Sequence, residues 1–170
     1  MNGGKKTLLV CLAALLALTL CACGGEAQGG GSAQVNMSQL QRAMLAADPS
    51  LQQMTSVTSQ AADGETLFAY VSALPYDKVE SFLLSYSSAG KADELAVIAV
   101  KDTKDVEEAA QSLRDHVQQR LQLFRQYGPD QAARVEQALV FTQDNCAVLI
   151  IADQSQAVRE ALEQTLSARA

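Results

Sequence analysis

The clearest chemistry in this sequence lies at Cys23, which closes the stretch Leu20-Cys21-Ala22-Cys23. A basic start at Lys5-Lys6 and an apolar run over residues 8–20 come before it. Such a start, an apolar core and a small residue before the cleavage point are typical of a secretory signal peptide. A thiol directly after that small residue can take a diacylglyceryl group before cleavage. We therefore predict a lipoprotein signal over residues 1–22 and lipidation of Cys23.

Two other interpretations of this segment are open: a membrane anchor helix, and an ordinary signal peptide with a cysteine nearby by chance. A spanning helix needs about 20 apolar residues, and this run is shorter. Cys21 is a second thiol, but the bulky Leu20 precedes it, so Cys23 is the better acceptor. Two acyl chains are enough for stable anchoring. We expect the membrane to be a partner through a lipid anchor on Cys23, on the extracytoplasmic face of a bacterial cell membrane.

The charge of the chain bears on its partners. The sequence has 170 residues with 13 Lys and Arg against 19 Asp and Glu, a net charge of −6. Loss of Lys5 and Lys6 with the signal would lower this to −8. That balance argues against a nucleic-acid partner, because phosphates require basic patches.

Residues 23–36 are rich in Gly, Ser, Ala and Gln, which predicts a lipidated cysteine followed by a flexible tether. Residues 37–170 are then expected to form a single α+β domain.

Hydrophobic spacing sets the expected elements. The clearest is a long helix with an apolar stripe, carried by Val106, Ala110, Leu113, Val117, Leu121 and Phe124. Helices are predicted over residues 37–47, 65–73, 103–127, 129–137 and 154–168. Strands are predicted over residues 79–87, 94–101, 139–142 and 146–152, with 54–59 as a possible short strand.

These elements form two similar units, each with a strand, a turn, an apolar strand and a helix. We therefore predict an α+β fold with a mostly antiparallel sheet of about four strands, built from two strand-strand-helix units, with short N-terminal helices. The connectivity places both long helices on one face, and we expect the helices over residues 37–47 and 65–73, or a second copy of the protein, to cover the other. Asp102 and Asp153 are expected to cap the two long helices, and Gly128 to end the first in a left-handed conformation.

Two further residues could do nucleophilic chemistry, His116 and Cys146. His116 lies beside Val117 and off the apolar stripe, so we expect it on the exposed flank of the long helix. Cys146 opens an apolar strand and is expected to be a small buried hydrophobe rather than a reactive thiol. A nucleophilic pair of the two is therefore not expected. Zinc needs three or four ligands, which one histidine and one such cysteine do not supply.

The carboxylates do not suggest acid–base catalysis or a metal site. They stand at Asp93-Glu94, Asp102, Asp105 and Glu107-Glu108. Asp102 and Asp105 fit helix capping, and Lys104 and Glu108 have the spacing of a surface ion pair. Residues 102–108 lack the central glycine of a calcium-binding loop. Tyr76, Tyr86 and Tyr127 could line a pocket, although packing is the favoured role for each. We predict no catalytic residue, metal or cofactor.

Several segments resemble the bacterial lipoproteins that carry the domain of unknown function 4358. They are Leu74-Pro75-Tyr76-Asp77-Lys78-Val79-Glu80, Ser85-Tyr86-Ser87, Ala92-Asp93-Glu94-Leu95-Ala96-Val97-Ile98, Tyr127-Gly128-Pro129-Asp130-Gln131 and Ala147-Val148-Leu149-Ile150-Ile151. Their order and spacing carry the resemblance, from about residue 48 to the C-terminus. It implies a location and a fold, and no activity. We expect a non-catalytic binding or scaffolding role with a protein or small-molecule partner; a small envelope hydrolase and an accessory subunit of a transporter or sensor are the alternatives.

Overall fold

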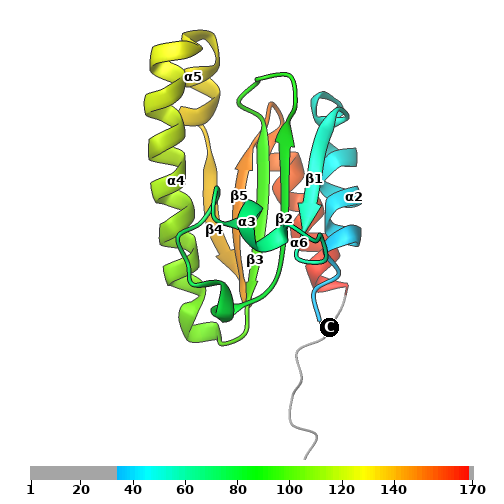
Figure 1. Ribbon diagram of the computed structural model, residues 1–170. Helices are drawn as coiled ribbons and strands as arrows, with labels where there is room; N and C mark the ends of the chain where they lie inside the picture. The colour runs from blue at the N-terminus through cyan, green and yellow to red at the C-terminus, as the bar shows by residue number, and fades with distance from the viewer. Residues whose placement is uncertain (1–33, 169–170) are drawn as a thin grey trace, which may run out of the picture. The chain divides into compact units, whose positions relative to one another are not determined.

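A computed structural model describes residues 34–168 of the chain. Within them, five strands form one antiparallel sheet in the order β1-β2-β3-β5-β4, with helices on both faces (Figure 1). The strands are β1 (Met54–Thr58), β2 (Val79–Ser87), β3 (Glu94–Val100), β4 (Leu139–Gln143) and β5 (Cys146–Ile151). The helices are α2 (Met37–Ala47), α3 (Gly64–Phe68), α4 (Val106–Tyr127), α5 (Pro129–Glu136) and α6 (Ser155–Ser167).

The α+β class and the antiparallel pairing are confirmed, but the sheet has five strands where the sequence predicts about four. The fifth is β1, which pairs with β2 so that Met54 stands opposite Ser87. The hydroxyl oxygens of Ser56 and Ser85 lie 2.7 Å apart across this pair. A short edge strand of Ser and Thr has little apolar alternation, which is why the sequence marks it only weakly.

The two central strands, β3 and β5, separate two hydrophobic cores. Every residue of both strands is buried. In β3, Ala96 and Ile98 belong to the core under α4, and Leu95 and Val97 to the core on the opposite face. This alternation confirms the prediction that the strand is covered on both sides, as expected for a strand that is apolar throughout.

The prediction that both long helices cover one face is wrong. α4 and α3 pack on one face, and α6 packs beside α2 on the other, as Figure 1 shows with α3 in front of the sheet and α6 behind it. α4 has 22 residues and extends over β3, β5 and β4, so that face is already covered when the chain leaves β5. Val148 and Ile150 of β5 belong to the core on the opposite face, where Val158 and Leu162 of α6 pack with them.

Of the two aspartate caps that the sequence predicts, the one at Asp102 is formed and the one at Asp153 is not. The Asp102 carboxylate accepts from a backbone N–H two residues on, as predicted, although the turn it caps is a 3-10 turn (Thr103–Asp105) that precedes α4. Asp153 does not cap α6, because its carboxylate is paired with Arg134. The Asp48 carboxylate takes that place and accepts from Gln154 N at 2.7 Å. A cap from a residue so distant in the chain has no local sequence signature.

The segment predicted as a helix over residues 65–73 is helical only at Gly64–Phe68. Its apolar side chains Phe68, Val71 and Leu74 pack on the α4 face of the sheet, so the prediction that this segment joins residues 37–47 on the face opposite the long helix is wrong. Both cores are completed by residues between Val35 and Leu166, and residues 33–170 form a compact unit through their own contacts. This segment therefore has within itself the contacts that fold it. Among the described residues, none of the helices has the length and apolar character to cross a membrane.

Candidate functional site

A cavity of about 1070 Å³ lies on the α4 face, between the second half of α4, the segment around α3 and the end of the β2–β3 hairpin. Its size is at the upper end of the range of small-ligand pockets, about 300–1,000 Å³. Because α3 is a helix of 5 residues, it leaves this part of the sheet open. Among the described residues, the large apolar side chains that are strongly exposed are Tyr70, Leu123 and Tyr127, and all three line this cavity.

The polar part of the cavity is built around Glu94. This is the first residue of β3, and its side chain is 3% exposed. His116 Nε2 lies 2.8 Å from Glu94 Oε1, and Arg120 Nε lies 2.8 Å from Glu94 Oε2. With Glu94 ionised, the His116 Nε2–H is the donor. His116 and Arg120 are four residues apart on α4, so both reach the same carboxylate from one helix face.

Arg120 is held in place from several sides. Its guanidinium carbon lies 5.1 Å from the centre of the Phe124 ring, a cation–π contact, and its Nη2 donates to Ala92 O at 3.1 Å. Its Nε, although close to Glu94, does not point along the line to the carboxylate oxygen, so that contact is an ion pair without a hydrogen bond. Of its five N–H donors, the one on Nε is buried beside Glu94 and one on Nη2 bonds Ala92 O, which leaves the other N–H groups of the guanidinium without an acceptor among the described residues.

Gly128 supports this arrangement by a close approach rather than by the left-handed conformation that the sequence predicts. Its φ is −155°, which lies outside the left-handed region. Gly128 is the C-cap of α4 and also the N-cap of α5, whose first residue is Pro129. A Cβ at this position would lie 3.0 Å from Cδ1 of Phe124. The glycine thus allows the Phe124 ring, on which Arg120 rests, to pack against the corner between the helices.

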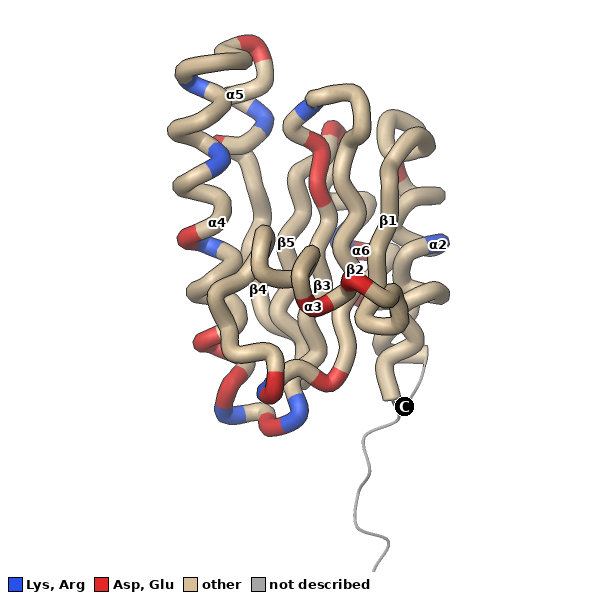
Figure 2. The backbone as a smooth tube through the Cα atoms, viewed as in Figure 1, with Lys and Arg blue, Asp and Glu red and all other residues tan. Residues whose placement is uncertain are grey.

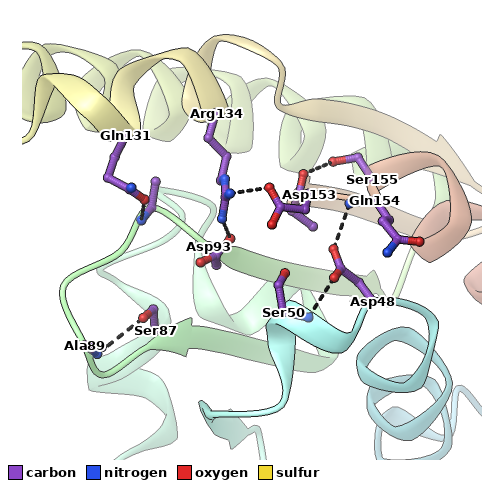
Figure 3. Close-up of polar contacts among 12 residues, drawn as sticks. Asp48, Ser50, Ser87, Ala89, Asp93, Gln131, Arg134, Asp153, Gln154 and Ser155 are labelled. Carbon is purple, nitrogen blue, oxygen red and sulfur yellow. Dashed lines mark hydrogen bonds and ion pairs between the residues drawn. The ribbon is translucent and has the colours of Figure 1, made fainter.

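A second polar cluster lies outside the cavity and joins four parts of the chain (Figure 3). Arg134 of α5 points between Asp93, before β3, and Asp153, after β5, and pairs with both. Asp93 is 2% exposed, so its charge depends on this partner. The nearby Asp48 is also buried and bonds Gln154. These contacts tie the hairpin, α5 and the start of α6 together, which is a structural role.

The predicted positions of His116 and Cys146 are wrong in one case and right in the other. His116 was expected on an exposed flank, but its side chain is 13% exposed and bonded to Glu94. Its helical phase puts it beside the stripe, and the face of β3 lies close enough for that flank to be covered. Cys146 is fully buried, as predicted. It lies in the core under α2 and α6, so the sheet separates it from His116.

The surface ion pair predicted between Lys104 and Glu108 is not formed. Lys104 pairs with Asp102 at 2.7 Å, and Glu108 pairs with Lys78 at 2.5 Å. Lys78 also pairs with Asp105, so the chain segment before β2 supplies the cation that the helix spacing assigned to Lys104.

Among the residues that the structure describes, no three His, Cys, Asp or Glu side chains are grouped so that they could hold a metal ion.

The three tyrosines have different surroundings. Tyr76 packs edge-on against the Phe68 ring, with centres 5.4 Å apart, and is part of the core. Tyr86 and Tyr127 both line the cavity, and Tyr127 is 75% exposed. The lipidation site Cys23, the signal over residues 1–22 and the predicted tether as far as residue 33 lie outside the described residues. The prediction that the tether extends to residue 36 is wrong, because Val35 is buried in the core and the Asn36 side chain caps α2.

Glu94, His116 and Arg120 were not predicted as a group. A signal was present: Glu94 is an acidic residue at the start of a strand that is otherwise apolar on both faces. A carboxylate that enters such a strand is buried and requires a positive partner. His116 and Arg120, spaced by four on the helix after that strand, are candidates for that partner.

Comparison with known families gives a match that covers the sheet region. Residues 53–152 match the family described as Domain of unknown function (DUF4358), and the chain belongs to this family. The matched region begins just before β1 and ends just after β5, so it contains the whole sheet together with α3, α4 and α5. Neither a curated protein nor a solved structure matches the chain.

Proposed function

We propose that this protein is an extracytoplasmic lipoprotein, anchored through Cys23, that binds a small ligand in the cavity beside α4 without catalysis. The observation that carries the binding role is the position of Tyr70, Leu123 and Tyr127. Exposed large apolar side chains gathered at one concave site, with a few polar groups at its base, are typical of ligand binding. The family assigns no activity.

The binding role is tested with N-phenyl-1-naphthylamine, a neutral dye that fluoresces in apolar sites, and with residues 33–170. We expect saturable binding that Leu123→Asp weakens at least tenfold, because Leu123 lines the cavity. Gln118→Asp adds the same charge to an exposed position of α4 that does not line it, and should leave binding unchanged. Equal binding by both variants, or no binding, would contradict the proposal. A dimer that Leu123→Asp dissociates would assign the apolar surface to self-association instead.

The anchoring part is tested separately in cells that express the full chain. Replacing Cys23 with Ala should abolish fatty-acid labelling and move the protein out of the detergent phase. Cys21→Ala is the matched control and should be labelled like the natural sequence. Labelling that survives in Cys23→Ala would refute lipidation at this residue, and labelling lost only in Cys21→Ala would move the site.

A second candidate is a small envelope hydrolase, and the pairing of Glu94 with His116 at the cavity is the observation that favours it. Two titratable groups that face each other at a pocket are a common feature of active sites. We favour binding because Arg120 neutralises the carboxylate, and because no hydroxyl or thiol of the described residues hydrogen-bonds to His116. Hydrolysis of 4-nitrophenyl butyrate decides: a rate equal to that of His116→Gln supports binding, and a rate well above it supports the hydrolase.

A further inference from the structure

The polar groups of the cavity indicate the chemical class of its ligand. We propose that the cavity takes a small organic anion with a flat apolar body, its anionic group on Arg120 and Lys91 and its body against the aromatic rim. This inference rests on the binding role proposed above. Its basis is the arrangement of donors and acceptors at the base of the cavity.

The acidic groups at the cavity are already engaged. Glu94 is buried and has both oxygens in contact with basic side chains of α4. The other carboxylate that lines the cavity, Asp130, accepts from Gln131 Nε2 at 3.3 Å. A cationic ligand at Glu94 would therefore have to displace His116 or Arg120.

The basic groups still have capacity. Arg120 lines the cavity and is 20% exposed, and of its five donors one makes a hydrogen bond, to Ala92 O. Its buried Nε is without a hydrogen bond in the structure. A planar guanidinium with free N–H groups matches carboxylate, sulfonate and phosphate oxygens, often in a bidentate way.

Lys91 adds a second positive group. It follows Gly90, whose φ of +73° forms the turn of the β2–β3 hairpin, and it is exposed at the cavity. In the described part of the chain it forms no salt bridge. In Figure 2 a basic segment stands at the tip of this hairpin. Lys91 is therefore a positive charge at the cavity that no carboxylate of the described residues pairs with, and the N–H groups of Arg120 that make no hydrogen bond lie at the same cavity.

The rim selects the body of the ligand. Tyr70, Tyr86 and Tyr127 line the cavity together with Phe124, and Leu123 of α4 lines it as well. Aromatic side chains bind flat apolar groups through offset or edge-on contacts. A small inorganic anion has no group to fill this space, so we expect the apolar body to be required.

The test compares two dyes on residues 33–170: 8-anilinonaphthalene-1-sulfonate, which has a flat apolar body and a sulfonate, and the neutral N-phenyl-1-naphthylamine. Arg120→Gln should weaken the sulfonate dye at least tenfold, about 1.4 kcal/mol, and change the neutral dye less than twofold. Glu94→Gln removes the competing carboxylate and should tighten the sulfonate dye. Inorganic sulfate at equal concentration should not displace it.

Lys91→Gln keeps the test decisive if Arg120→Gln fails to fold, because Lys91 is exposed and its loss leaves no buried group unpaired. It should weaken the sulfonate dye severalfold and leave the neutral dye unchanged. If both dyes bind and neither Arg120→Gln nor Lys91→Gln separates them, the anionic class is wrong while the binding role stands. If neither dye binds, the binding role itself is wrong, and this inference with it.

Discussion

Glu94 and His116 are joined by a hydrogen bond of 2.8 Å that links the first residue of β3 to the middle of α4. Neither group is on the surface: the Glu94 side chain is 3% exposed and the His116 side chain 13%. The bond therefore fixes α4 on the sheet at the edge of the cavity. It also determines which donors of Arg120, one turn further along the helix, are left for a ligand.

His116→Ala should lower the free energy of unfolding by about 1–3 kcal/mol, because it leaves one oxygen of a buried carboxylate without a donor. The sequence alone predicts a small effect here, since it places His116 on an exposed flank. Gln119→Ala, at an exposed position on the same helix, is the control and should stay within about 0.5 kcal/mol. Denaturant unfolding of both variants measures the difference. Equal losses would mean that the bond to Glu94 contributes nothing.

Arg134→Ala should destabilise the fold by about 3–5 kcal/mol, because it leaves the buried Asp93 without a partner charge. Arg125→Ala is the matched control. It removes the same side chain from a pair with Glu136 in which both side chains are about half exposed, 60% and 48%. Such pairs contribute about 0–1 kcal/mol. Thermal or denaturant unfolding compares the two variants, and a small loss at Arg134 would refute its structural role.

The stability conferred by Asp48 should depend on acid pH. Burial by itself raises the pKa of Asp48, but hydrogen bonds from Gln154 and Ser50 outweigh it and hold the pKa below its usual value. Because the folded pKa is depressed, this stabilisation is fully present above the unfolded pKa of about 3.9 and is lost as the pH falls through the folded pKa.

The variant Asp48→Asn should therefore lose about 1–3 kcal/mol at pH 7, and its deficit should shrink as the pH is lowered below about 4. Gln52→Ala, at an exposed position close by in the chain, should have little effect at either pH. Urea unfolding at a series of pH values provides the comparison. A deficit that stays constant down to pH 2 would show that the charge of Asp48 does not contribute.

Cys146 should react slowly with a thiol reagent in the folded protein and rapidly in denaturant, because it is fully buried under α2 and α6. In residues 33–170 it is the one cysteine of the sequence, so the reaction of a single thiol is followed. Met44→Ala would loosen the cover over this core and should speed the reaction. Fast modification of the native protein would show that the core is open at this point.

Much of the fold was predictable because its elements carry regular hydrophobic spacing. β2 and α2 have the bounds that the sequence predicts, and the stripe from Ala110 to Leu121 is buried as expected. What the spacing could not show was which face each helix covers. The position of α6 depends on α4 having already covered β5 and β4, which is a property of the assembled sheet and not of either helix.

The candidate site was less predictable, for a related reason. Glu94, His116 and Arg120 become a group only when β3 and α4 pack together, and the cavity exists because the segment around α3 is too short to cover the sheet. Tyr86 and Tyr127 were recognised as possible pocket residues, while Tyr76 is a core residue. The caps at Asp48 and Gly128 depend likewise on distant or shared neighbours.

The most direct test of the central claim, that the cavity beside α4 binds a small ligand, is a nuclear magnetic resonance titration of isotope-labelled residues 33–170 with N-phenyl-1-naphthylamine. We predict saturable shifts at Leu123 and Tyr127 on α4, at Tyr70 after α3 and at Tyr86 near the end of β2. The signals of Val158 and Leu162, in the core on the opposite face, should stay in place. Shifts centred on α2 and α6, or no shifts at all, would contradict the claim.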